Sequence, residues 1–339
     1  MRSTLVALGV LVGAAAIPAA VRAQDGPEEG GLGPALSEYV RGVEAIANSR
    51  PLFRPEAAGI DGTWADDDPF NPANAGPARA RGRGDSIGVD VGAGTLAHGS
   101  TQVRENGNVG TRLDLRDDLG IRSFTEVRLR YTHRYDGDSR FTFSLTDVLL
   151  RGSDTPSSDV LYNASVLKGG VPIRSRPFYV VLEGRYERVL ARWGSGRGSS
   201  LSFDGGLRFD DIHWYLNGIV PATSPHAEVD EDFNKQAIPV PVLGLTLRTP
   251  LSDRWGFHAT VRGTRVNHWP TLRNEGGAVA WSETFLEAGV GVTWRLSKAA
   301  AMDLGYRYQI VDINETSGED GNAVGFATHG LVLGLTLDF

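Results

Sequence analysis

The chain has 339 residues, of which 41% are hydrophobic and 43 are glycine, and its formal net charge is -7. It contains no cysteine, which excludes a disulfide scaffold and thiolate metal sites. It also lacks a lysine-rich tract and a basic helix, so we expect no nucleic acid partner.

The first 23 residues have the layout of a secretory signal peptide. Arg2 gives a positive start, Leu5 to Ile17 form an apolar core, and Val21-Arg22-Ala23 is a small-x-Ala cleavage site. The alternative is a membrane anchor helix, but Pro18 and a core shorter than the roughly 20 residues of a spanning helix argue against it. We therefore predict a cleaved signal and a secreted mature chain.

Residues 24–84 differ in composition from everything that follows. They are rich in Pro, Gly, Ala and Asp, which predicts a mostly disordered, flexible periplasmic segment. Within it, residues 34–49 space Leu36, Tyr39, Val40 and Val43 as one face of a short helix. This helix could dock loosely in the periplasm, plug a barrel or contact another envelope protein.

From residue 85 onward, apolar residues alternate with small or polar ones. This period of two is that of a strand with one apolar face, because successive side chains point to opposite faces. No apolar run is long enough to cross a bilayer as a helix. Eleven segments follow the pattern clearly: 86–96, 110–118, 124–134, 139–151, 177–190, 199–209, 241–249, 254–264, 284–296, 301–310 and 329–339. Two weaker candidates are 158–168 and 211–220.

The connections between these strands alternate between short turns and long polar loops. Residues 251–254 and 296–298 are short, whereas 221–236, 266–281 and 313–327 are long. Short periplasmic turns and long extracellular loops are typical of an outer-membrane barrel. We predict an all-β fold, a closed antiparallel transmembrane β-barrel over residues 85–339. Twelve strands are favoured, with ten as the alternative.

The polar faces of the strands carry many charges of both signs. A soluble sandwich would expose such charges to water, whereas a barrel gathers them in one lumen where they neutralise each other. The near balance of ten arginines and eight acids favours the lumen. Ten of these residues are the predicted lumen charges: Arg128, Arg130, Glu183, Arg185, Arg248, Arg262, Glu287, Arg295, Asp303 and Arg307.

The last strand ends in an apolar face with a terminal aromatic residue. Its alternate positions are Leu331, Leu333, Leu335, Leu337 and Phe339. This arrangement resembles the sorting signal that bacterial outer-membrane proteins present to the barrel-assembly machinery. Pro239 to Leu245, followed by a short turn, also resembles repeats in poorly characterised outer-membrane barrel proteins. The resemblance implies the outer membrane as location, lipid and lipopolysaccharide as surroundings, and no particular activity.

Catalytic and metal sites are weakly indicated. His268 with Glu275 and Glu283 is the best catalytic constellation, and acidic clusters occur at 228–232 and 312–320, but a solvated acidic loop explains both. We therefore predict no catalytic residue, no metal and no cofactor.

Three functions are compatible with the sequence. The first is passive transport through a narrow, porin-like pore, or a structural role in the envelope. The second is a hydrolase acting on lipid or surface polymer through loops 221–236 and 266–281, and the third is an adhesin-like binder.

Overall fold

The computed structural model describes residues 84–339 except 106–107, 164, 195–197, 221–223, 236–238, 275–277 and 317–320. The predicted signal peptide and the predicted helix at 34–49 lie outside the described residues. No helix in the described part of the chain is long and apolar enough to span a bilayer.

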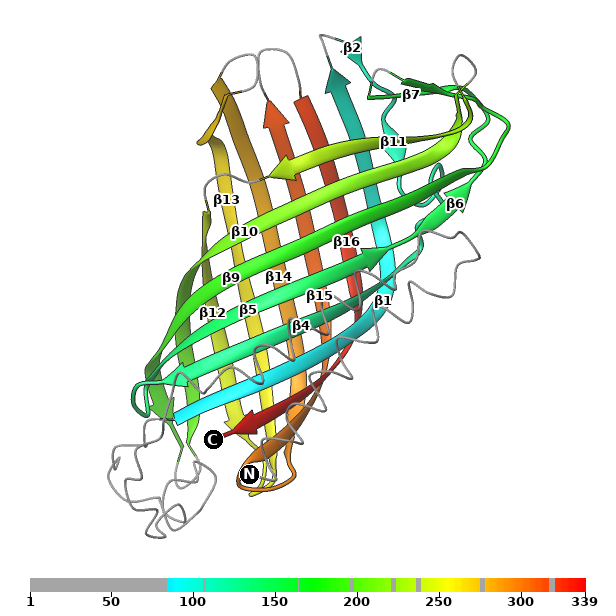
Figure 1. Ribbon diagram of the computed structural model, residues 1–339. Coiled ribbons are helices and arrows are strands. Elements are labelled where there is room, and N and C mark those ends of the chain that lie inside the picture. Colours follow the sequence, from blue (N-terminus) through cyan, green and yellow to red (C-terminus); the bar gives the residue numbers. More distant parts are fainter. Residues whose placement is uncertain are drawn as a thin grey trace, which may run out of the picture. The chain divides into compact units, whose positions relative to one another are not determined.

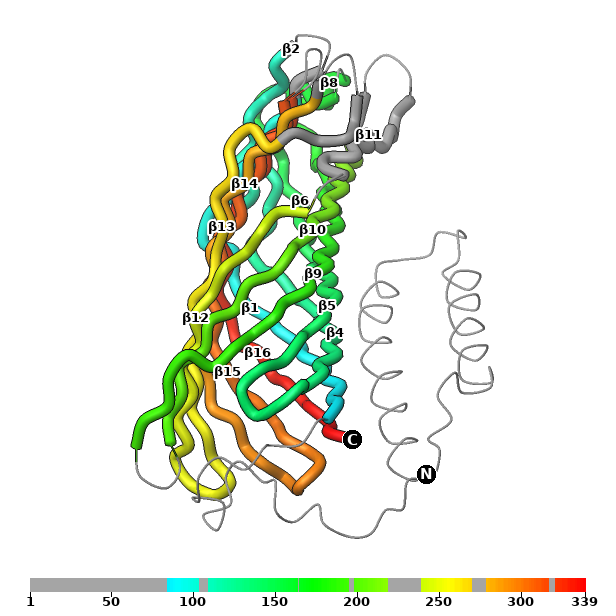
Figure 2. The backbone as a smooth tube through the Cα atoms, turned by 90° about the vertical axis from the view of Figure 1, so that its left-hand side faces the viewer, coloured from blue at the N-terminus to red at the C-terminus, as the bar shows by residue number. Residues whose placement is uncertain are grey.

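Ten antiparallel strands close into a ring (Figures 1 and 2). In ring order they are β1 (Gly84–Glu105), β4 (Ser123–Arg134), β5 (Ser139–Leu150), β9 (Ile173–Trp193), β10 (Ser199–Val220), β12 (Val240–Pro250), β13 (Trp255–Asn274), β14 (Ala278–Arg295), β15 (Ala300–Thr316) and β16 (Gly321–Asp338). β1 pairs with β16 and β9 pairs with β10, so this ring has no free edge. The predicted all-β, closed antiparallel barrel is confirmed.

Six shorter strands complete the fold. They are β2 (Asn108–Val109), β3 (Leu113–Asp114), β6 (Gly152–Asp154), β7 (Val160–Tyr162), β8 (Ser165–Leu167) and β11 (Ser224–Lys235). β7 and β8 form a separate hairpin, and β11 pairs with the last part of β10. We call the end of the barrel that carries β2 and the β7–β8 hairpin the loop end, and the opposite end, with the C-terminus, the turn end (Figure 1).

The favoured count of twelve strands is wrong, and the alternative count of ten is the observed one. Residues 110–118 contribute no wall strand, because their alternating leucines are buried inside the barrel. Residues 158–168 contain the β7–β8 hairpin, a separate two-stranded sheet that contributes no strand to the ring. Residues 211–220 are not a separate strand but the continuation of β10.

The predicted long loops are mostly strand. β13 runs to Asn274 and β14 begins at Ala278, so most of 266–281 extends the wall. β15 and β16 likewise occupy most of 313–327, and β11 occupies most of 221–236. Seven wall strands have 17 to 22 residues, whereas about 9–11 tilted residues cross a bilayer. The barrel is therefore taller than a membrane.

An apolar belt covers the outer wall towards the turn end. On β14 its exposed members are Leu286, Val290 and Trp294, and above them the outward residue Thr284 is polar. Trp255 and Trp294 stack at the lower edge, with ring centroids 5.6 Å apart. An apolar belt with aromatic residues at its border is typical of a lipid-facing surface.

The interior changes character along β10. Its inward side chains are Ser202, Asp204, Arg208 and Asp210, and then Ile212, Trp214 and Leu216, all buried. β10 therefore continues without a turn through Asp210-Asp211, and it keeps the same face inward throughout. What changes is the lumen itself, from charged to apolar.

Candidate functional site

A network of ion pairs crosses the middle of the lumen. We call it the charge layer; its members are Glu126, Arg128, Glu183, Arg185, Arg262, Glu287 and Arg307. Arg262 on β13 holds Glu287 on β14 through two hydrogen bonds of 2.8 and 3.0 Å. Its third nitrogen binds Glu183 on β9. A planar guanidinium with a fixed fork of donors is suited to this double role.

Two further bridges in this layer join walls that are not neighbours. Arg128 on β4 lies 3.4 Å from a Glu287 oxygen on β14. Glu126 on the same β4 strand pairs with Arg307 on β15. Since three strands separate β4 from β14 in the ring, these contacts span the lumen rather than run along one wall.

The charge layer is well buried. Arg262 and Glu183 each expose only 3% of their surface, and Glu287 exposes 6%. Loss of one partner would leave the other charge buried without compensation, which costs on the order of 3–5 kcal/mol. The layer is therefore a fixed part of the structure and not a set of freely moving side chains.

Inward glycines make room for these long side chains. A Cβ on Gly92 would lie 2.7 Å from the Glu126 carboxylate, and one on Gly244 would lie 2.6 Å from an Asp204 oxygen. Both distances are shorter than a Cβ contact allows. The abundance of glycine thus follows in part from a lumen that is filled by charged groups.

A second polar cluster lies next to the charge layer, towards the loop end. Arg208 binds Asp210 through two hydrogen bonds of 2.7 Å, and both contact the hydroxyl of Tyr179. Glu283 lies 3.7 Å from Arg208 and accepts a hydrogen bond from the Trp281 indole at 3.1 Å. The Arg208 guanidinium also stacks over Phe285, 3.9 Å from the ring centroid.

Above this cluster the lumen is filled by apolar side chains, which we call the dry core. Trp214, Trp281, Val311 and Ile313 point inward from the wall, and each exposes 1% or less. Where water fills the lumen of a membrane barrel, the inward residues are polar. A packed apolar interior indicates that water does not pass through this part of the barrel.

Two inserted segments complete the dry core at the loop end. The connection between β1 and β4 contributes Leu113, Leu115, Leu119 and Ile121, all at 1% exposure or less. Its turn is fixed by Asp114, whose Oδ1 accepts hydrogen bonds from the backbone N–H groups of Arg116 and Asp117. The β7–β8 hairpin adds Val160, Tyr162 and Leu167.

The turn end of the lumen is more open to water. Glu187 is shared by Arg140 and Arg248 at 2.7 and 2.5 Å, and Arg130 binds Asp90 at 2.7 Å. The side chains of Arg140 and Arg248 are 31% and 36% exposed, in contrast to the charge layer. Solvent therefore reaches the interior from this end.

The predicted lumen charges fall into three groups. Six belong to the charge layer: Arg128, Glu183, Arg185, Arg262, Glu287 and Arg307. Arg130, Arg248 and Asp303 lie nearer the turn end. Arg295 stands apart as the last residue of β14, directly before the turn that leads to β15.

Sequence reasoning did not place Tyr179, Asp210 and Glu283 in the lumen, although it named Glu283 together with His268 as a catalytic candidate. Two of them lie on the inward face of a strand that carries a predicted lumen charge: Tyr179 precedes Glu183 by four residues, and Glu283 precedes Glu287 by four. Extending the period of two beyond the predicted strand ends would have found both acids.

The structure does not assemble the candidate catalytic constellation. His268 is exposed and its backbone N–H donates a hydrogen bond to Ser282, whereas Glu283 is buried inside the barrel. The side chain of Glu275 lies outside the described residues. Asp312 and Glu315 likewise face opposite sides of the wall. Within the described residues, no group of three or more His, Asp or Glu could hold a metal ion.

No protein-family model and no curated protein matches the chain. Among solved structures, it is similar to the outer membrane protease OmpT from Escherichia coli, with 11% identity and a TM-score of 0.45 over 78% of this chain and 100% of that one. It is also similar to the translocator domain of the autotransporter NalP from Neisseria meningitidis, with 13% identity and a TM-score of 0.34 over 91% and 98%. The Pseudomonas putida toluene transporter TodX gives 10% identity and a TM-score of 0.29 over 84% and 94%. Similarities this low assign no activity and no partner.

Proposed function

We propose that this protein is a closed outer-membrane barrel with a structural role in the envelope, and that it does not conduct ions or solutes. The observation that carries the proposal is the pair of barriers in the lumen. Ion pairs cross from opposite walls in the charge layer, and the dry core fills the barrel above them.

A conducting path would have to disrupt both barriers. Water entering the charge layer would separate buried ion pairs, and water entering the dry core would meet apolar side chains without hydrogen-bond partners. Barrels with eight strands are filled by side chains and those with sixteen leave a channel, so ten strands leave the choice to the side chains. Here the side chains favour closure.

The apolar belt and the even strand number support a location in the outer membrane. The proposed orientation places the turn end in the periplasm, because turns on that side are short and the last strand ends there. The loop end, with its inserted segments, then faces the outside of the cell, where lipopolysaccharide is the neighbouring lipid.

The C-terminal strand is proposed to engage the barrel-assembly machinery. Leu331, Leu333 and Phe339 are exposed on the outer wall, which suits a signal read by another protein. Replacement of Phe339 by Ala should lower the amount of folded barrel in the outer-membrane fraction, whereas Phe143→Ala, at an exposed position of β5, should not. Equal amounts for both variants would contradict this part of the proposal.

The first test is conductance of the refolded barrel in a planar bilayer. We expect no steady current from the full-length mature chain or from a chain that lacks residues 24–83. A known porin in the same bilayer controls for sensitivity, and flotation with vesicles controls for insertion. Steady ion-selective steps would overturn the closed barrel. A current only after truncation would make the N-terminal segment a plug and would equally contradict the proposal.

A further inference from the structure

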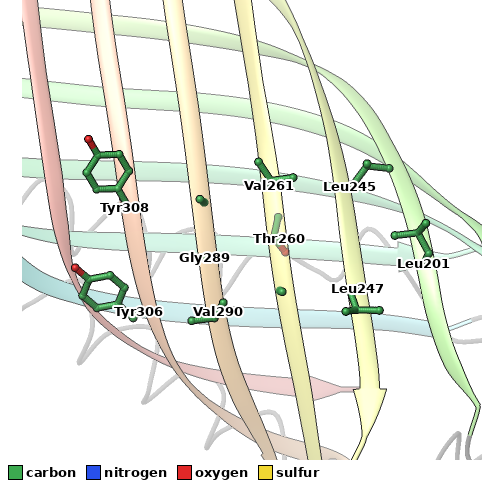
Figure 3. A pocket seen from close by; sticks show the side chains of 11 residues that line it. Leu201, Leu245, Leu247, Thr260, Val261, Gly289, Val290, Tyr306 and Tyr308 are labelled. Carbon is green, nitrogen blue, oxygen red and sulfur yellow. The ribbon is translucent and has the colours of Figure 1, made fainter.

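A shallow apolar groove of about 470 Å³ runs along the outer wall within the belt. Small side chains, Ala259 on β13 and Ala288 on β14, form its floor. Leu245 and Leu247 on β12 form one side, and Tyr306 and Tyr308 on β15 form the other (Figure 3). Leu201 on β10 also lines the groove, which therefore lies across five adjacent strands, on a surface that contacts hydrocarbon.

A chain of hydrogen bonds holds the tyrosine side of the groove. The hydroxyl of Tyr306 lies 2.9 Å from Nδ1 of His329 on β16, and Nε2 of His329 lies 2.9 Å from Oγ1 of Thr95 on β1. All three side chains are on the outer wall. Thr95 and His329 are paired residues at the loop-end limit of the belt, since Leu331, Leu333 and Leu335 follow His329 towards the turn end.

One hydroxyl hydrogen in this series of hydrogen bonds, from Tyr306 through His329 to Thr95, has no acceptor among the three residues. A neutral imidazole carries one N–H, and the two hydroxyls carry one hydrogen each, so two hydrogen bonds use two of three donors. If Nδ1 carries the proton, the Tyr306 hydroxyl keeps a free hydrogen; if Nε2 carries it, the Thr95 hydroxyl does. A donor without an acceptor is costly in a lipid environment. The site therefore calls for an acceptor from outside these three residues.

We propose that the groove binds an acyl chain of lipopolysaccharide, with an acyl carbonyl of the same lipid accepting the remaining hydroxyl hydrogen. The acyl chain lies between the leucines of β12 and the tyrosines of β15, over Ala259 and Ala288. The carbonyl lies at the loop-end limit of the belt, where the polar part of an outer-leaflet lipid begins. This inference rests on the orientation given under the proposed function.

Charge above the groove favours lipopolysaccharide over a zwitterionic phospholipid. Arg265 is exposed on the outer face of β13, four residues beyond Val261 towards the loop end. Arg116 is also exposed, and its guanidinium binds the carbonyls of Leu96 and Ala97, directly after Thr95. Arginine is suited to the phosphates of the lipid A sugars.

A second copy of this chain is a poorer occupant. A two-fold dimer would place the same surface of both copies face to face. Groove would then meet groove, and the space between them would lose van der Waals contacts. A flexible acyl chain fills one groove without leaving such a void.

The test measures lipid retained by the purified barrel, by native mass spectrometry after titration with lipid A or with phosphatidylethanolamine. We expect one lipid A bound in preference to phosphatidylethanolamine. The double variant Ala259→Leu/Ala288→Leu, which fills the floor, should lose it. Ala93→Leu is the matched control, because Ala93 is an exposed alanine on the outer face of β1 and does not line the groove.

The carbonyl contact has its own pair of variants. Tyr306→Phe keeps the ring and removes the hydroxyl, so the affinity for lipid A should fall about fivefold, which corresponds to one hydrogen bond of ~1 kcal/mol. Tyr186→Phe, at an exposed tyrosine on β9 that does not line the groove, should leave it unchanged. Arg265→Gln should reduce the preference for lipid A over phosphatidylethanolamine.

Several outcomes would overturn the inference. Equal retention of the two lipids would remove the case for lipopolysaccharide. If the Ala259→Leu/Ala288→Leu variant retains lipid A as the unaltered barrel does, the groove is not the binding site. If the barrel is a dimer and this variant dissociates it, the occupant of the groove is a second copy of the protein. A barrel that conducts but still binds lipid A would contradict only the proposed function, and a silent barrel without lipid preference only this inference.

Discussion

The two halves of the lumen share the seven long wall strands but are filled in different ways. Towards the turn end, inward positions carry arginines and acids, and solvent reaches Arg140 and Arg248. Towards the loop end, β10, β14 and β15 place Trp214, Trp281 and Ile313 inward, and these apolar side chains are fully buried. A single strand such as β10 takes part in both halves, so a regular alternation of faces is compatible with either kind of interior. The side chains, rather than the strand geometry, decide whether a barrel of this size is wet or dry.

The largest expected effect comes from opening the dry core. Trp214→Ala removes a fully buried indole and should destabilise the barrel by about 3–5 kcal/mol. The measurement is urea-induced unfolding of the barrel in lipid vesicles. Trp193→Ala, at an exposed position near the turn end, is the control and should cost far less. Similar losses for both variants would mean that the loop end is not a packed core.

A loss of the same order is expected from the charge layer. Arg262→Met leaves Glu183 and Glu287 buried without their shared partner and should cost on the order of 3–5 kcal/mol. Arg134→Met breaks an ion pair with Asp338 whose side chains are 42% and 35% exposed, and should cost about 0–1 kcal/mol. If the two substitutions cost the same, the charge layer is not shielded from water.

Arginine substitutions on the outer wall should have an intermediate effect on stability, and they distinguish the apolar belt from the part of the wall above it. Val290 and Thr284 face outward on the same strand, β14, inside and above the apolar belt. Val290→Arg should destabilise the membrane-embedded barrel by about 2–4 kcal/mol, and Thr284→Arg by about 0–1 kcal/mol. Comparison of their unfolding in vesicles locates the upper limit of the belt. A greater loss for Thr284→Arg would place the membrane higher on the barrel.

The smallest effect concerns a turn at the turn end. The carboxylate of Asp136 accepts hydrogen bonds of 2.7 Å from the backbone N–H groups of Asp138 and Ser139, and these lower the pKa of Asp136. Because the folded pKa lies below the unfolded one, the stabilisation is complete above the ordinary pKa of about 4 and is lost as the pH falls through the lowered value. Asp136→Asn should therefore flatten slightly the fall of stability with pH in that range. An unchanged pH profile would show that these hydrogen bonds contribute nothing measurable.

The amino-acid sequence by itself predicted the all-β barrel and the two faces of its strands, and it indicated charged side chains on the inward face. These properties are local, because a period of two fixes the two faces of a strand wherever it lies. The sequence also contained the leucines at 113 and 115, but their alternation predicted a wall strand. Only the tertiary structure showed that this segment is buried inside the barrel, because an apolar face can pack against lipid or against an interior with the same pattern.

The strand number, the ion pairs that cross the lumen and the outer-wall groove were likewise decided by tertiary structure. The partners of Arg262 come from residues 183 and 287, and those of His329 from residues 95 and 306. Which distant side chains meet depends on strand order and register. Register is set by the pairing of all ten strands around the ring, and no single segment of the sequence contains it.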